Sequence, residues 1–159
     1  MMLKEKLADK SIIFFSVQTF NLEKEIKKKL EEFGAKVDYY DERPSNNSFA
    51  KGIIRIKRSF YQNKIDRYYK QILSKTKNET YHYLFVNRGE VVPEFFLEDF
   101  KKNHPECEFV FYTWDSFTNH NHPTKILKYF ERKFTFDPVD AVKFNLNFRP
   151  LFYLDSYKK

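Results

Sequence analysis

The sequence predicts an α/β fold, a single Rossmann-like three-layer domain with a mainly parallel sheet. Short apolar runs alternate with amphipathic segments along the chain, which is typical of parallel α/β proteins. The stretch 109–116 has five aromatic or β-branched apolar residues among its first six, and no charge before Asp115. A strand buried on both faces has this composition. The 159 residues suit one domain with a sizeable core.

Six apolar runs, separated by turn residues, predict strands at residues 11–17, 35–40, 81–86, 109–114, 132–136 and 149–153. The doubly wound pattern predicts the order 3-2-1-4-5 for the first five strands. The strands at 11–17 and 109–114 are the most apolar. We therefore expect them to be neighbours near the centre of the sheet.

Helices are expected between these strands, at residues 22–33, 49–75, 94–103, 124–130 and 139–144. Residues 1–10 are charged and are expected to be helical or frayed. In the segment 22–33, apolar residues recur at helical spacing, with Asn21 expected as the N-cap and Gly34 just past the end. Gly52 and residues 61–63 are expected to break the second segment into two helices. Asp137 is expected to cap the last helix, with Pro138 in its first turn.

The composition limits the class of partner. Lys and Arg number 29 against 22 acidic residues, and the formal charge of +7 favours anionic partners. The basic segment 51–70 predicts weak binding to anionic membrane surfaces, with a solvated helix face as the alternative. A nucleic-acid binder is the third hypothesis, but the sequence contains no RNP, KH or zinc pattern to support it.

The sequence also favours a reducing compartment. Cys107 is the only cysteine and is expected to be a buried, inert thiol. The longest apolar run near the N-terminus, residues 12–15, is too short for a signal peptide or a membrane span. We expect a cytoplasmic chain, peripheral at the inner face of the membrane.

Four stretches together resemble the N-terminal half of a glycosyltransferase-like family found in capsular-polysaccharide, lipopolysaccharide and spore-coat gene clusters. They are residues 41–45 (DERPS), 88–90 (RGE), 112–116 (YTWDS) and 134–140 (FTFDPVD), with 150–153 (PLFY) continuing the last. The similarity covers roughly residues 10–155. It implies a GT-B architecture, in which an acceptor domain and a nucleotide-sugar domain face each other across a cleft.

The resemblance implies that residues 1–159 are the acceptor-side domain of a transferase for polysaccharide or lipopolysaccharide biosynthesis. The C-terminal nucleotide-sugar domain is not in this sequence, so we expect no transfer without such a domain or chain. The expected ligand is a sugar or lipid-linked acceptor. The alternative is a non-catalytic Rossmann-like binding or scaffold module.

Polar residues that follow the strands form the predicted site, because ligands of parallel sheets bind beyond the carboxyl ends of the strands. Glu90 and Asp115 are the catalytic candidates, since inverting glycosyl transfer needs a base for the acceptor hydroxyl. Substrate-binding candidates are Arg43, Arg88, Trp114 and Ser116. The structural alternatives are that Glu90 pairs with Arg88, that Asp115 caps a turn and that Trp114 packs in the core.

No cofactor or metal is expected. The sequence has neither G-x-G-x-x-G nor a Walker motif, so a ribose-binding role for residues 41–43 is disfavoured. His120 and His122 lack a third ligand nearby, and two solvated loop histidines are the preferred interpretation. If the predicted site is functional, Glu90→Gln and Asp115→Asn should abolish transfer and leave thermal stability nearly unchanged.

Overall fold

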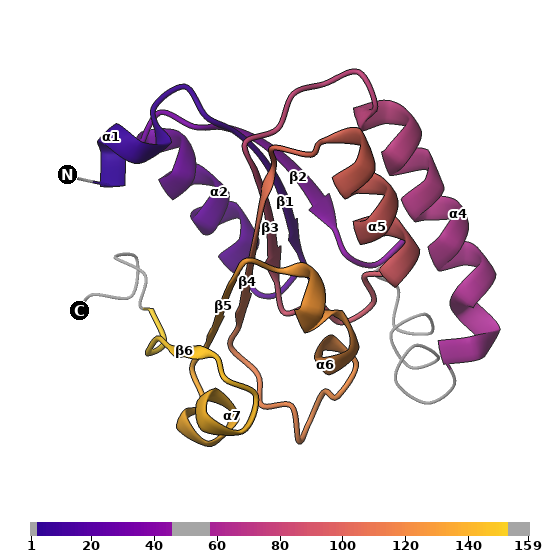
Figure 1. Ribbon diagram of the computed structural model, residues 1–159, viewed down its shortest axis with the longest axis vertical. Coiled ribbons are helices and arrows are strands. Elements are labelled where there is room, and N and C mark those ends of the chain that lie inside the picture. Colours follow the sequence, from indigo (N-terminus) through magenta and orange to yellow (C-terminus); the bar gives the residue numbers. More distant parts are fainter. Residues whose placement is uncertain (1–2, 46–57, 153–159) are drawn as a thin grey trace.

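The computed structural model describes residues 3–45 and 58–152. Within them, six parallel strands form one sheet in the order β2-β1-β3-β4-β5-β6 (Figure 1). The strands are β1 (Ser11–Ser16), β2 (Lys36–Asp41), β3 (Tyr83–Asn87), β4 (Glu108–Thr113), β5 (Arg132–Thr135) and β6 (Asn147–Phe148). The helices are α1 (Leu3–Leu7), α2 (Leu22–Glu32), α4 (Arg58–Thr76), α5 (Glu94–Asn103), α6 (Pro123–Ile126), the 3-10 turn η1 (Leu127–Tyr129) and α7 (Pro138–Lys143). The predicted Rossmann-like α/β class is confirmed.

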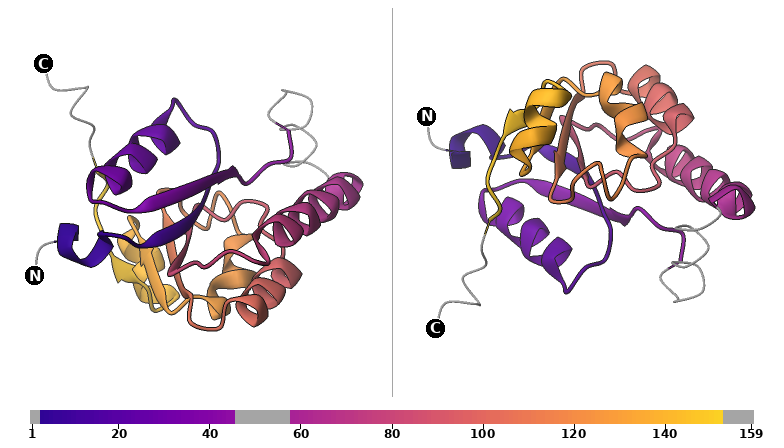
Figure 2. Two further views of the ribbon diagram at one scale, coloured as in Figure 1. Left: turned by 90° about the horizontal axis from the view of Figure 1, so that it is seen from above. Right: turned by 90° about the horizontal axis from the view of Figure 1, so that it is seen from below.

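Helices cover both faces of the sheet, as the three-layer prediction requires. Figures 1 and 2 show α2 on one face, and α4 and α5 on the other. Beneath α4 and α5 lies the larger core, in which Phe15 contacts Tyr69 and Phe96 with ring centroids 5.8 and 5.2 Å apart. A smaller core beneath α2 contains Phe14 and Val37. Strand residues therefore alternate between the two cores.

The predicted strand order is wrong. β3 lies between β1 and β4 and pairs with both, so the two most apolar strands are near the centre but are not neighbours. β2 forms the edge, because Lys36 and Asp38 are exposed on it and charged residues suit an edge strand. Leu84 and Val86 of β3 are fully buried, which suits an interior strand.

Three local predictions fail as well. α4 continues through residues 61–63, because Ile65, Tyr69 and Ile72 bury one continuous stripe; the predicted break at Gly52 lies outside the described residues. Residues 149–152 are not a strand, since Pro150 has no N–H to continue the ladder after β6. Asn21 makes no side-chain cap hydrogen bond, because its backbone is left-handed at φ 63°.

Other elements follow the prediction closely. α5 has the expected bounds. Gly34 ends α2 with φ +89°, a conformation that favours glycine. The carboxylate of Asp137 caps α7 by accepting from the amides of Val139 and Asp140 at 2.8 and 3.2 Å. In the described part of the chain, no helix has the length and apolar character to cross a membrane.

Candidate functional site at the carboxyl edge of the sheet

The loops after β2, β3 and β4 meet at the carboxyl edge of the sheet. β3 and β4 are paired neighbours, so Glu90 and Asp115 follow adjacent strands. Arg43 follows β2 and reaches Glu90 from 47 positions away in the sequence. The structure thus brings Arg43, Arg88, Glu90 and Asp115 into one charged network.

Arg43 and Glu90 form a buried, bidentate ion pair. Arg43 Nε and Nη2 donate to the two carboxylate oxygens of Glu90 at 3.2 and 2.5 Å. Only 3% and 4% of the two side chains are exposed. Arg43, a substrate-binding candidate from the sequence, is therefore enclosed in this ion pair. Glu90 is also 3.6 Å from Arg88, so its main partner is Arg43 and not the expected Arg88.

Glu42 is a second buried carboxylate in the network. It accepts hydrogen bonds from the amides of Gly89, Glu90 and Val91 at 2.9, 2.5 and 3.4 Å. Burial raises the pKa of Glu42 to about 8 and the neighbouring Glu90 adds to the rise, against the lowering effect of the three amides. Glu42 lies in the loop after β2, and through these three hydrogen bonds it holds the loop after β3 in place.

That loop has an unusual backbone. Arg88 and Gly89 have φ of +93° and +70° in succession. A Cβ added to Gly89 would lie 2.9 Å from the ring of Phe111 and 3.2 Å from Ile126. Glycine is thus required at position 89 both for its conformation and for the close approach. Arg88 occupies a conformation that is rare for a long side chain, and such residues cluster at functional sites.

Arg88 is at the centre of the more accessible part of the network. Its Nη2 donates to Asp115 Oδ2 at 3.1 Å, and it also contacts His120 Nε2. His120 Nε2 is 3.6 Å from Asp115 Oδ2. The Nε of Arg88 is buried and has no hydrogen-bond partner among the described residues. About a quarter of the Asp115 side chain and 22% of His120 are exposed, so these two groups can meet a ligand.

The remaining predicted residues lie beside this cluster. Trp114 is half-buried, and its ring is 6.1 Å from that of Phe152. Ser116 Oγ accepts from the amide of Thr118 at 3.2 Å. Asn119 donates to Asp115 Oδ1 at 3.3 Å. Trp114 and Ser116 thus flank Asp115 at the end of β4.

The arrangement supports acid–base chemistry and binding of polar ligands more than metal or thiol chemistry. No group of three or more His, Cys, Asp or Glu within residues 3–45 and 58–152 is placed to hold a metal ion. His122 instead contacts the carbonyl of Val92 at 3.1 Å. Cys107 is buried, which raises the pKa of its thiol to about 12, so the thiol stays protonated.

Sequence reasoning missed the roles of Glu42 and His120. His120 could have been suspected, because it lies only five residues after Asp115 in the same loop. Glu42 carried no such signal. Its function as an acceptor for the 89–91 amides depends on the loop after β2 folding against the loop after β3.

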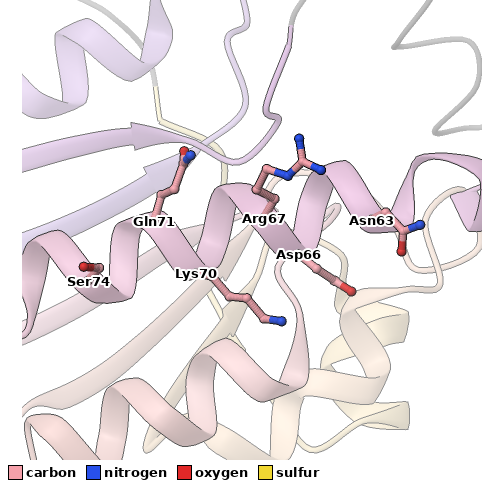
Figure 3. A pocket seen from close by; sticks show the side chains of 6 residues that line it. All are labelled: Asn63, Asp66, Arg67, Lys70, Gln71 and Ser74. Carbon is pink, nitrogen blue, oxygen red and sulfur yellow. The ribbon is translucent and has the colours of Figure 1, made fainter.

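A hollow of about 470 Å³ lies along α4, away from this network. It is lined by Asn63, Asp66, Arg67, Lys70, Gln71 and Ser74. Figure 3 shows that these side chains fan out from one helix and do not converge on a point. Ligand sites need convergent polar groups, so the hollow is not the preferred site.

Comparison with protein-family models, with curated proteins and with solved structures gave no match.

Proposed function

We propose that the chain is the acceptor-side domain of a glycosyltransferase-like protein, with the reaction carried out next to Asp115. The observation that carries the proposal is the Arg88–Asp115–His120 cluster at the end of β4. It places two titratable, partly exposed groups 3.6 Å apart at the edge where parallel sheets bind ligands. The sequence resemblance described above supports the sugar as substrate class.

Asp115 has the role of general base in this proposal. Its carboxylate takes the proton from an acceptor hydroxyl as that oxygen attacks the anomeric carbon of the donor sugar. The bond from that carbon to the nucleotide phosphate breaks, and the nucleoside diphosphate leaves on the side of the nucleotide-sugar domain. Arg88 orients the carboxylate through the 3.1 Å contact, and the His120 ring, which also contacts Arg88, lies beside it. Trp114 and Ser116 contact the acceptor.

Glu90 has a positioning role in this proposal. Both of its oxygens are bonded to Arg43, and 4% of its side chain is exposed. A carboxylate so enclosed has no free path to a substrate hydroxyl. It instead holds the loop that carries Arg88.

The proposal is tested by measuring glycosyl transfer from a panel of nucleotide sugars to lipid-linked acceptors. The 159 residues alone should give no turnover, because in this proposal they form the acceptor side and the donor site belongs to a nucleotide-sugar domain. With a matching C-terminal domain it should transfer sugar, and Asp115→Asn should reduce the rate at least about a hundredfold, the usual size of a general-base contribution. Transfer by the chain alone, or full activity of Asp115→Asn, would contradict the proposal.

A non-catalytic binding module is the second candidate function. The supporting observation is that four charged residues of the site form ion pairs with one another, which is a structural role. They are Arg43, Glu90, Arg88 and Asp115. A binding module predicts acceptor binding that survives Asp115→Asn, and no transfer with any partner domain.

A further inference from the structure

The strand order places a topological switch point between β1 and β3. The chain leaves β1 towards α2 on one face of the sheet, and leaves β3 towards α5 on the other (Figure 1). Open parallel sheets bind ligands at such a switch point. The last residues of the two strands, Ser16 and Asn87, are register partners there.

Two buried oxygen atoms at this point have unfilled hydrogen-bonding capacity. Asn87 is fully buried and donates through Nδ2 to Ser16 Oγ at 3.4 Å, while its Oδ1 has no partner among the described residues. Glu23 is 1% exposed, and its Oε2 accepts from the amide of Thr19 at 3.0 Å. Its Oε1 likewise has no partner in the described chain. A buried oxygen without a hydrogen-bond partner destabilises the fold, so both atoms call for an explanation.

The loop between β1 and α2 adds two further unfavourable features. Phe20 is 86% exposed, so its ring contributes almost no burial to the fold. Phe20 and Asn21 have φ of +50° and +63°, which is strained for a bulky side chain. Strain, an exposed ring and two unpaired oxygens occur together at one end of the sheet.

The charged side chains near the β1/β3 switch point favour a ligand that donates hydrogen bonds over an anionic ligand. Burial first, and then the nearby carboxylates of Asp41, Glu23 and Glu42, raise the pKa of the Tyr39 phenol. Tyr39 donates to the carbonyl of Ser16 at 3.0 Å, so Asp41 and Glu23 place acidic side chains near the end of β1. A phosphate would meet repulsion there, whereas a hydroxyl group would find acceptors.

We propose that the end of the sheet at the β1/β3 switch point binds a sugar ring. Two sugar hydroxyls donate to Asn87 Oδ1 and Glu23 Oε1, and the apolar face of the ring lies against Phe20. Solvent does not reach either oxygen, so the loop of residues 17–21 shifts when the sugar binds. The inference deepens the proposed function and rests on it for the ligand class. The sugar is either a glycan unit of the acceptor or the ribose of a nucleoside.

The test is a titration of the ¹⁵N-labelled 159-residue chain with maltose, N-acetylglucosamine and uridine, followed by amide chemical shifts. At least one probe should shift the amides of residues 16–21 and 87 in a saturable way. Saturation by either glycan sugar assigns the site to the acceptor, and saturation by uridine alone assigns it to a nucleoside. No saturable shift with any of the three would overturn the inference.

Variants separate a ligand site from a structural one. Asn87→Leu removes the unpaired oxygen, so it should keep or raise the melting temperature and weaken sugar binding at least about tenfold. Phe20→Ala should weaken binding with unchanged stability. Val142→Ala, which is also 86% exposed in the parent chain, is the matched control and should bind normally. Normal sugar binding by Asn87→Leu, with a lower melting temperature, would mean that a buried water satisfies the oxygen, and would overturn the inference.

Failure of this inference can be told apart from failure of the proposed function. Sugar binding that depends on Asn87, combined with full transfer activity of Asp115→Asn, would contradict the role of Asp115 alone. Transfer that depends on Asp115, combined with unchanged sugar binding in Asn87→Leu, would contradict only the proposed sugar site at the β1/β3 switch point.

Discussion

Removing one partner of the Arg43–Glu90 pair should strongly destabilise the fold. The two side chains are 3% and 4% exposed and share two hydrogen bonds. Glu90→Gln leaves the Arg43 guanidinium buried without its main counter-ion, which costs about 3–5 kcal/mol. This prediction differs from the expectation from the sequence, in which Glu90→Gln leaves stability nearly unchanged.

Urea denaturation at neutral pH measures this loss of unfolding free energy. Asp99→Asn is the matched control, because its partner Lys102 is 73% exposed and a surface ion pair of this kind contributes little to stability. The double variant Arg43→Met, Glu90→Leu removes both charges and should be more stable than Glu90→Gln. A loss for Glu90→Gln no larger than that for Asp99→Asn would refute the reasoning.

Further substitutions test the loop and the surface. Gly89→Ala should cost about 1–3 kcal/mol, because the new Cβ meets Phe111 at 2.9 Å in a left-handed conformation; thermal melting measures it. Between about pH 5 and 8, folded Glu42 keeps a proton that the unfolded carboxyl, with its ordinary pKa of 4.5, has lost. Stability should therefore fall as pH rises through this range, and Glu42→Gln should remove that slope in urea titrations. Cys107 should react with a thiol reagent in folded protein only at the rate of unfolding, and fast labelling would contradict its burial. Flotation with phosphatidylglycerol vesicles should show weak, salt-sensitive binding through α4, and binding independent of lipid charge would contradict it.

The sequence was sufficient for most of the helices and strands but not for their arrangement in the sheet. Helix α5 and strand β1 follow from local patterns, namely a Pro-initiated amphipathic segment and an apolar run. The strand order depends on which backbone pairs with which across the sheet, and apolar content alone does not distinguish β1 from β4. The alternation of Lys36 and Asp38 was a usable sign that β2 is an edge strand.

The sequence also predicted only part of the candidate site. The rule that ligands bind at the carboxyl ends of parallel strands brings Arg88 and Asp115 together, and the structure places them 3.1 Å apart. The burial of Arg43 against Glu90 was not predictable, because it depends on contact between loops 47 residues apart. The unpaired oxygen of Asn87 depends on β3 lying beside β1, which the expected order excluded.

The most direct test of the account compares the transfer rate and the melting temperature of Asp115→Asn with those of the parent, each joined to a matching nucleotide-sugar domain. Arg88 keeps Glu90 as a counter-ion at 3.6 Å, and Asn retains an acceptor oxygen for Arg88. The melting temperature should therefore change by only about 2–4 °C, equivalent to about 1 kcal/mol. Transfer should fall at least about a hundredfold. A large drop in melting temperature with transfer retained would mean that Asp115 is structural, and would contradict the account.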